Sequence, residues 1–385
     1  MHSLLAVSVW NVPEWRYKMN QETKMNENEY ESSALPADIP TQRKQLLLFL
    51  LIAYGVTYAM GLLTWYGNTI SADLGAFPNA QMFYPAAGVM LAYLVTRRKD
   101  SLMPKCFYIC FLFVTVVMLL CAVCAIAMPG QTLDLNGLSI PLWSMLSQYL
   151  LIGGTILCWI TLLISGKNRR AAYGLRWQKG KASLICILVF LALYFGRAVL
   201  AYLADGQSDV VLAIVQDPAT WIYLLVTPLN FVMAFAPFFG EEYGWRYYLQ
   251  PIMQKRFGLR GGVLLLGVAW GIWHVFLDFF FYTTPDRGLI MTISQIITCV
   301  TLGIFFAWAY MKTGNIWVPV ILHFLNNNLG PVMVSDYSAD VLQNQQVTWA
   351  MIPAALLING ILFGLFLLAK EFRKSPCLMQ ESMLK

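Results

Sequence analysis

Long apolar segments alternate with short polar ones along most of this chain. About ten of the apolar segments approach the roughly 20 residues that a helix needs to cross the hydrocarbon core of a bilayer. They cover approximately residues 46–66, 80–96, 106–128, 142–164, 182–203, 221–239, 263–281, 289–310, 316–334 and 349–369. The pattern therefore predicts an all-α fold, a polytopic membrane bundle of about ten transmembrane helices.

The charged residues between these segments predict the topology. Lysine and arginine gather in every second loop, as in 97–105 and 167–181, whereas the intervening loops are acidic and contain Arg287 as their single basic residue. Basic loops remain on the cytoplasmic side of a membrane. Both termini are therefore predicted to be cytoplasmic, in a multi-pass protein of the cell membrane. The net charge of +6 arises from these loops, so we expect no nucleic-acid partner.

Composition supports a membrane protein and argues against a disulfide framework. Hydrophobic residues make up 58% of the chain and charged residues 12%, with a mean hydropathy of +0.60, whereas charged residues make up about a quarter of soluble domains. The eight cysteines lie mostly inside apolar segments and lack metal-site spacing. They are predicted to be small core residues with free thiols.

Four regions are predicted along the chain. Residues 1–42 form a polar tail that is expected to be disordered, without the features of a signal peptide and with Met25 as an alternative start. Residues 43–181 hold four transmembrane helices of unassigned role, and 373–385 form a cytoplasmic C-terminal tail. The intervening region, 182–372, is predicted to be the catalytic core because it contains the ionisable residues inside apolar segments.

Two adjacent carboxyl groups, Glu241 and Glu242, lie at the end of an apolar segment. Each carries an insertion penalty of roughly 2.5 to 3.5 kcal/mol, so such residues are functional by default. Glu242 and Arg246 are four residues apart and share a helical face, which predicts an ion pair that would ordinarily be structural. Glu241 points about 100° away, without a cation of its own, as expected for a general base. Pro237 and Gly240 are predicted to kink the helix beside a cavity.

Two later motifs supply imidazoles, Trp270-Gly-Ile-Trp-His274 and His323-Phe-Leu-Asn-Asn327. His323 and Asn327 share a helical face, so both could direct N–H groups at one point, which suits an oxyanion hole. His274, one turn after Trp270, could share a water with a carboxylate. A single histidine on an apolar helix usually has only a packing role, so each motif carries little weight alone. Asp278 could orient His274 or be solvated at the outer interface, and both interpretations remain open.

The ordered set of motifs resembles the CPBP family. This family comprises the CAAX proteases and bacteriocin-processing enzymes, also called Abi, and includes the Rce1-type prenyl-protein endopeptidases. The resemblance covers about residues 221–331 and includes the stretch Thr313-Gly-Asn-Ile-Trp-Val-Pro, which is similar to that of bacterial members. It implies an intramembrane endopeptidase. The implied residues are Glu241 and His274 for activating water, His323 and Asn327 for stabilising the oxyanion, and Glu242, Arg246 and Trp270 in support.

The resemblance also implies a class of substrate, and the sequence differs from the family at one position. The substrate would be a peptide or a membrane protein, with or without a lipid modification, and the catalytic cavity would open to the cytoplasmic side. CAAX-type prenylated, leader, bacteriocin and signalling peptides are the substrate classes that the family suggests, and no cofactor is implied. The family usually has phenylalanine where Trp270 stands, so the pocket wall is expected to differ in size.

Two alternative functions remain open at the level of the sequence. In a zinc-dependent intramembrane metalloprotease, Glu241, His274 and His323 would bind the metal, although the chain has no H-E-x-x-H helix and Asn327 suits hydrogen bonding better than ligation. In a proton-coupled transporter, the same residues would form a proton relay. The second half of the chain shows no inverted repeat of the kind that transporters carry.

Overall fold

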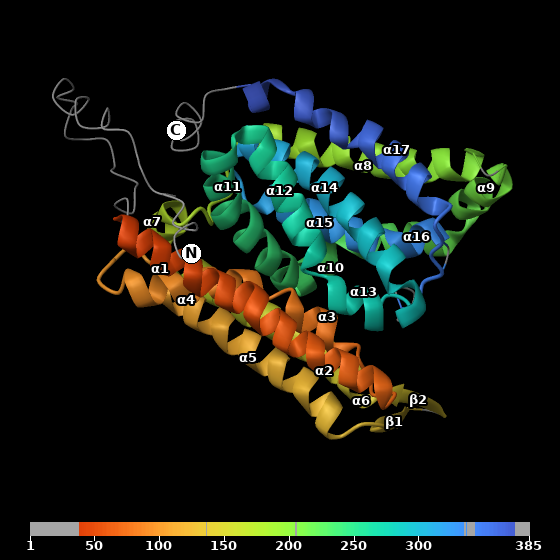
Figure 1. Ribbon diagram of the computed structural model, residues 1–385, viewed down its shortest axis with the longest axis horizontal. Coiled ribbons are helices and arrows are strands. Elements are labelled where there is room, and N and C mark those ends of the chain that lie inside the picture. The colour runs from red at the N-terminus through yellow and green to blue at the C-terminus, as the bar shows by residue number, and fades with distance from the viewer. Residues whose placement is uncertain (1–37, 136, 205, 335, 337–342, 374–385) are drawn as a thin grey trace, which may run out of the picture. The chain divides into compact units, whose positions relative to one another are not determined.

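The chain folds as a bundle of helices (Figure 1). The computed structural model describes residues 38–373, apart from 136, 205, 335 and 337–342, and these residues belong to one compact unit that spans 34–385. Within the described residues, the only strands are β1 (Thr132–Leu135) and β2 (Leu138–Pro141), which form an antiparallel hairpin. The predicted all-α fold class is therefore confirmed.

The first half of the bundle precedes the predicted catalytic core. Its helices are α1 (Ile39–Leu50), a π-helical stretch over Leu51–Val56, α2 (Thr57–Thr69), α3 (Ala76–Gln81), α4 (Tyr84–Thr96), α5 (Lys105–Ala127), α6 (Leu142–Ile164) and α7 (Lys167–Ala172). Helix α4 packs along α1 and α5, and it also contacts α10 of the second half. The two halves therefore share one packed interior.

The second half contains the segments with the predicted site residues. Its helices are α8 (Gly180–Ala204), α9 (Ser208–Gln216), α10 (Pro218–Glu242), a π-helical turn over Tyr243–Leu249, α11 (Gln250–Phe257), α12 (Leu259–Ile272), α13 (Val275–Phe280), α14 (Gly288–Thr313), α15 (Trp317–Asn328), α16 (Gly330–Val334) and α17 (Met351–Leu362). Short 3₁₀ turns cover Pro285–Arg287, Gly364–Leu368 and Lys370–Arg373. Helix α12 packs along α14, and α10 packs against α15 (Figure 1).

Within the part of the chain that the structure describes, seven helical segments are long and apolar enough to cross a membrane. They are Ile39–Thr69, Lys105–Ala127, Leu142–Ile164, Gly180–Leu203, Pro218–Phe257, Leu259–Phe280 and Pro285–Thr313. This number is smaller than the predicted ten or so, and the polytopic architecture is confirmed. The other three apolar segments, 80–96, 316–334 and 349–369, form helices of at most 13 residues. Such helices extend about 20 Å, which is less than the hydrocarbon thickness.

Glu241 lies inside a long helical segment that bends. Helix α10, the π-helical turn and α11 run from Pro218 to Phe257 over 40 residues, so the helical segment continues beyond the predicted span 221–239 and past Glu241. The backbone leaves helical geometry at Ala234 (φ −139°, ψ 24°), three residues before Pro237. A proline ring crowds the preceding turn and donates no hydrogen bond. The predicted kink is therefore confirmed, with its break at Ala234.

Two glycines bring the motif helix close to the first half of the bundle. A Cβ atom on Gly240 would overlap the carbonyl oxygen of Met82, and one on Gly244 would overlap Pro85. Small residues four apart let two helices approach closely in a membrane. Residues 82–85, which connect α3 to α4 and include the first two residues of α4, are called the elbow below. The elbow thus fixes the position of the turn that carries both glutamates.

Residues of the first half also form hydrogen bonds with Trp273, the residue next to His274. The indole Nε1 of Trp273 donates to the Ala53 carbonyl oxygen at 2.7 Å and lies 2.9 Å from the Thr57 hydroxyl oxygen. Gln81 Nε2 donates to the Trp273 carbonyl oxygen at 3.2 Å. These helices therefore support the backbone at the second motif. No separate role is assigned to residues 43–181.

Several predictions concern residues outside the described part of the chain. Residues 1–37, with Met25, and 374–385, with Cys377, lie outside it. Helix α1 already begins at Ile39, inside the predicted 1–42 tail. The seven described cysteines have free thiols, and four of them are buried, whereas Cys106 is exposed, so its predicted position in the core is wrong.

Candidate active site

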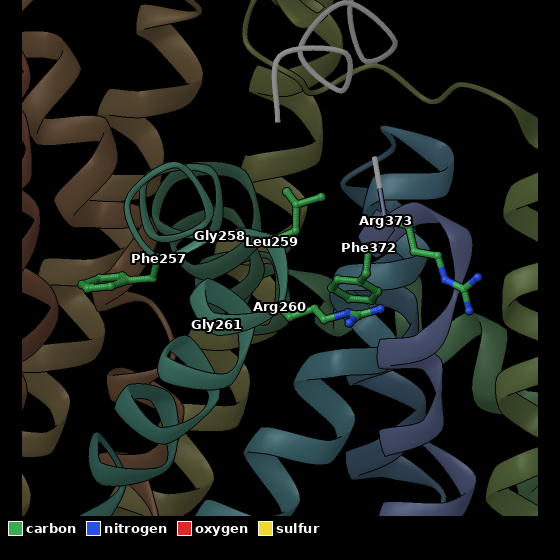
Figure 2. A pocket seen from close by; sticks show the side chains of 7 residues that line it. All are labelled: Phe257, Gly258, Leu259, Arg260, Gly261, Phe372 and Arg373. Atoms are coloured by element: carbon green, nitrogen blue, oxygen red, sulfur yellow. The ribbon is translucent and has the colours of Figure 1, made fainter. Parts of the chain in front are cut away.

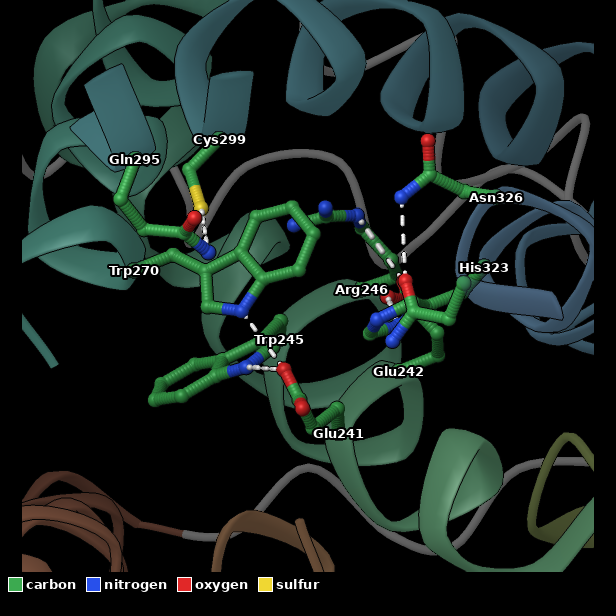
Figure 3. A network of polar contacts seen from close by, with 10 residues as sticks. Glu241, Glu242, Trp245, Arg246, Trp270, Gln295, Cys299, His323 and Asn326 are labelled. Carbon is green, nitrogen blue, oxygen red and sulfur yellow. Dashed lines mark hydrogen bonds and ion pairs between the residues drawn. The ribbon is translucent and has the colours of Figure 1, made fainter. Parts of the chain in front are cut away.

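Glu241 is buried and held by neutral donors. Its side chain is 1% exposed, and its Oε2 atom accepts hydrogen bonds from Trp270 Nε1 at 2.6 Å and from Trp245 Nε1 at 3.3 Å (Figure 3). Trp245 belongs to the π-helical turn that follows α10, and Trp270 lies on α12. Among the described residues, no cation forms an ion pair with Glu241.

Glu242 occupies a charged cluster instead. Arg246 Nε lies 3.1 Å from Glu242 Oε2, and His323 Nδ1 lies 2.9 Å from Glu242 Oε1 (Figure 3). Glu242 and Arg246 are 0% and 1% exposed, and buried charges are tolerated only when they are paired in this way. The predicted Glu242–Arg246 pair is confirmed. The bond to His323 was missed, because residues 81 positions apart give no local signal.

Trp270 joins the two glutamate environments. Its indole donates to Glu241, and the Arg246 guanidinium carbon lies 4.6 Å from the centre of its ring. The His323 ring meets it edge-on, with the ring centres 5.4 Å apart. Arg246 is therefore stabilised by a cation–π contact as well as by Glu242. A phenylalanine at this position could keep the ring contacts but not the hydrogen bond.

His274 lies at the break between α12 and α13. Its Nδ1 atom is 2.9 Å from the Trp270 carbonyl oxygen, and its ring meets Trp273 edge-on at 4.9 Å between centres. A carbonyl oxygen has no proton to donate, so His274 Nδ1 donates the hydrogen bond and carries a proton, and Nε2 is the atom left for other partners. The structure does not test the predicted sharing of a water between His274 and Glu241.

Asp278 is neither solvated nor bonded to the His274 imidazole. Its side chain is fully buried, and its carboxyl group interacts with the Thr292 side chain on α14. Only its backbone N–H reaches His274, through the helical bond to that residue's carbonyl oxygen at 2.9 Å. Of the two interpretations that the sequence left open, solvation is wrong and orientation of the imidazole has no hydrogen bond to support it.

The three consecutive asparagines, Asn326, Asn327 and Asn328, form hydrogen bonds with one another and with the α15 backbone. Asn327 Oδ1 accepts from Asn326 Nδ2 at 3.0 Å, and Asn328 Nδ2 donates to the Phe324 carbonyl oxygen at 2.9 Å. Within the described residues, the Asn327 side-chain N–H groups therefore remain for another acceptor. The role of Asn327 in an oxyanion hole stays a prediction.

Two cavities lie away from these residues. One of about 450 Å³ is lined by Phe257, Gly258, Leu259, Arg260, Gly261, Phe372 and Arg373 (Figure 2). Another, of about 210 Å³, is lined by Trp159, Leu162, Arg170, Leu175, Trp177, Phe231, Trp317 and Ile321. No predicted site residue lines either of these two cavities, and the glutamates and histidines are buried.

The three proposed zinc ligands do not fit a metal site as they are placed. Within residues 38–373 as described, no group of three His, Cys, Asp or Glu side chains is arranged to hold a metal ion. The bonds described above use Glu241 Oε2 and the Nδ1 atoms of His274 and His323. A histidine that donates from Nδ1 can still bind a metal through Nε2, so the zinc alternative stays a prediction.

Comparison with known proteins identifies the segment that contains the site. The model of the type II CAAX prenyl endopeptidase Rce1-like family matches residues 220–329. These residues are similar to that family and are called the Rce1-like segment below. All seven predicted site residues fall inside the Rce1-like segment, which nearly coincides with the predicted 221–331.

A relative supports the same assignment over part of its length. The chain is 30% identical over 105 residues to CAAX prenyl protease 2 of Methanococcus maripaludis, which covers 26% of this chain and 38% of that protein. The match thus spans well under two thirds of the relative. No solved structure matches the chain. The Rce1-like segment carries the site, while the elbow and Thr57, which support it, lie outside that segment.

Proposed function

We propose that this multi-pass membrane protein is an intramembrane endopeptidase that hydrolyses a peptide bond with a water activated by Glu241. The observation that carries the proposal is the environment of Glu241 inside the Rce1-like segment. Two indole N–H groups hold its Oε2 atom, and no described cation pairs with it. Its Oε1 atom is thereby the one to accept a proton from water.

The reaction needs only groups that the chain supplies. Glu241 Oε1 takes one proton from the water while the water oxygen attacks the carbonyl carbon, and His274 Nε2 accepts a hydrogen bond from the same water. The carbonyl π electrons move to its oxygen, which receives N–H groups from His323 and Asn327. Glu241 then returns the proton to the peptide nitrogen, the C–N bond breaks, and a carboxyl group and an amine result.

The bond between Glu242 and His323 gives Glu242 a part in this scheme. His323 Nδ1 donates to Glu242 Oε1, so Nε2 can also donate to an oxyanion only if the ring carries both protons. The Glu242 carboxylate balances the charge of that imidazolium, and Arg246 balances the carboxylate. Glu242 is therefore a positioning residue in the proposal, because it acts through His323.

The substrate is proposed to be a peptide or a membrane-protein segment. CAAX-type prenylated, leader, bacteriocin and signalling peptides are the candidate classes, and the relative's name, CAAX prenyl protease 2, favours the first. The basic loops around the spans support entry from the cytoplasmic side of the cell membrane. The prediction that both termini lie in the cytoplasm requires an even number of spans and stays a prediction.

The proposal can be tested with purified protein in liposomes and fluorogenic peptides. A farnesylated CAAX peptide and its unmodified counterpart should be cleaved by the natural protein, and Glu241→Gln should lower kcat by roughly 1,000-fold or more while the melting temperature stays unchanged. A folded variant that cleaves at the natural rate would overturn the proposal.

Two further experiments distinguish the endopeptidase from the metalloprotease and the transporter. Activity that chelators remove and zinc restores would support the metalloprotease. Solute uptake that depends on Glu241, without cleavage of any peptide, would support the transporter. Neither alternative has a structural observation in its favour among the described residues.

A further inference from the structure

The larger of the two cavities described above lies where two apolar helical segments meet. It has a volume of about 450 Å³ and lies between the turn that joins α11 to α12 and the 3₁₀ turn Lys370–Arg373 (Figure 2). Phe257 ends one segment that is long and apolar enough to cross a membrane, and Leu259 begins the next. In a membrane, the cavity would therefore lie where the chain leaves and re-enters the hydrocarbon, at the depth of the lipid headgroups.

The wall of this cavity is cationic. Arg260 and Arg373 line it, and none of the described lining residues is acidic. Lys255 and Arg256 add positive charge on the exposed last turn of α11. The Arg256 guanidinium carbon lies 5.4 Å from the ring centre of Phe257, which lines the cavity. An anion that enters the cavity would thus meet two guanidinium groups and no lining carboxylate.

The acidic residue of the 3₁₀ turn, Glu371, is engaged by α14. Its Oε2 atom accepts from Trp308 Nε1 at 3.1 Å, and its Oε1 atom lies 3.9 Å from Lys312 Nζ. Its side chain is buried and does not line the cavity. The negative charge of this turn is therefore balanced inside the bundle and leaves Arg260 and Arg373 without a carboxylate.

The two arginines keep donors for a ligand. Arg260 Nε donates to the Leu367 carbonyl oxygen at 3.2 Å, which holds the side chain between α12 and the C-terminal turns. This bond uses one of the five N–H donors of a guanidinium group. Within the described part of the chain, neither arginine forms an ion pair. Guanidinium groups with free donors suit a phosphate, which can accept two parallel N–H bonds.

We propose that this cavity binds the phosphate headgroup of an anionic membrane lipid. Arg260 and Arg373 would contact the phosphate, and the Phe257 ring, which is 45% exposed, would face the acyl chains. Anionic lipids give the cytoplasmic leaflet its negative surface potential, and basic pockets between membrane helices on that side bind their headgroups. The predicted topology places the turn between α11 and α12 on the same side.

A bound headgroup would connect the start of α12 to the C-terminal turn. Helix α12 begins at the cavity with Leu259 and also carries Trp270, whose indole donates to Glu241. The lipid would thus fix one end of the helix that holds Glu241. A ligand that binds only the folded state stabilises that state by mass action. The lipid should therefore raise the melting temperature, whether or not the protein cleaves a peptide.

The first test measures lipid binding by the natural protein. The purified full chain in detergent is titrated with phosphatidylglycerol or with phosphatidylcholine of the same acyl chains, and native mass spectrometry counts the bound lipids. We expect phosphatidylglycerol to bind about tenfold more tightly. At equal concentrations it should raise the melting temperature by roughly 3 °C more than phosphatidylcholine does. Equal binding of the two lipids would overturn the proposal.

The second test assigns the preference to the cavity. The double variant Arg260→Gln/Arg373→Gln should lose the tenfold preference for phosphatidylglycerol, because its two phosphate donors are removed. Arg98→Gln/Arg176→Gln is the matched control. It removes the same charge from exposed positions in two other basic loops, and neither residue lines the cavity. If the control loses the preference as well, the charge of the whole surface attracts the lipid and the cavity site is wrong.

Inorganic phosphate distinguishes the lipid from a soluble ligand. If phosphate displaces phosphatidylglycerol and raises the melting temperature as much, the ligand is a free phosphate and the lipid is wrong. If the double variant does not fold, Arg373→Gln alone takes its place, because Arg373 is exposed. An unchanged lipid preference in that folded variant would contradict the assignment. Preferential binding of phosphatidylglycerol without cleavage of any peptide would support this inference and overturn only the proposed function.

Discussion

Glu241 and Glu242 are neighbours in the chain but have opposite kinds of partner. Glu242 lies between two cationic or ionisable groups, Arg246 and His323, whereas Glu241 accepts from two neutral indoles. The helix itself causes the difference, because successive side chains point about 100° apart. A single turn thus carries one carboxylate that is neutralised by its surroundings and one that remains free to accept a proton.

The largest expected effect comes from removing the cation on the Glu242 side. Arg246→Met should lower the free energy of unfolding by about 3 to 5 kcal/mol, because Glu242 would lose its buried ion-pair partner. Thermal unfolding in detergent would measure it. Arg256→Met, at an exposed position on α11, is the control and should change stability little. An equally small effect for Arg246→Met would mean that the buried pair is not needed.

Removing the charge of Glu242 should affect activity more than folding. Glu242→Gln can still accept from His323 Nδ1, but it no longer balances an imidazolium, so the oxyanion donor is weakened. We expect kcat to fall about 100-fold with a modest change in KM. Steady-state kinetics on the best peptide would measure this. An unchanged kcat would mean that Glu242 has only a structural role.

On the Glu241 side, replacing Trp270 should have a moderate effect. Trp270→Phe keeps a ring beside Arg246 and His323 but removes the N–H that lies 2.6 Å from Glu241. The loss of one such hydrogen bond to a charged group should change kcat by roughly tenfold. The substitution also restores the residue that CPBP proteins usually carry there, so an active variant with altered peptide preference would confirm the effect on the pocket wall.

The smallest effect is expected for the other indole. Trp245→Phe removes a bond of 3.3 Å, longer than that of Trp270, and a longer hydrogen bond is weaker. We expect kcat to change by only a few-fold. Measuring both variants in the same assay tests the ranking. A larger loss for Trp245→Phe would show that packing of this buried ring, rather than its N–H, controls Glu241.

Local helix geometry made part of this site predictable. The Glu242–Arg246 pair and the separation of the two glutamates follow from a spacing of four residues and from the helical rotation. The contacts Glu241–Trp270 and Glu242–His323 join different helices, and no spacing rule reports how helices pack. The same limit applies to Asp278, whose burial depends on α14 packing beside α13.

The helical membrane fold was predictable from the sequence, but the division of apolar segments into short helices was not. Hydropathy alone identified the apolar segments, but it cannot show where a segment divides into two short helices. In 316–334 the chain passes from α15 to α16 at Gly330, and Pro331 follows, and these residues break a helix without lowering the mean hydropathy much. The short α15 that carries His323 was therefore predicted as a full span.

The elbow at residues 82–85 has a consequence for how the protein is made. Synthesis proceeds from the N-terminus, so α3 and α4 enter the membrane before the turn with Gly240 and Gly244 leaves the ribosome. The later helix then docks onto a surface that already exists, and only a helix without a Cβ at these two points fits it. The first half of the chain thus serves as an assembly template for the turn that holds Glu241.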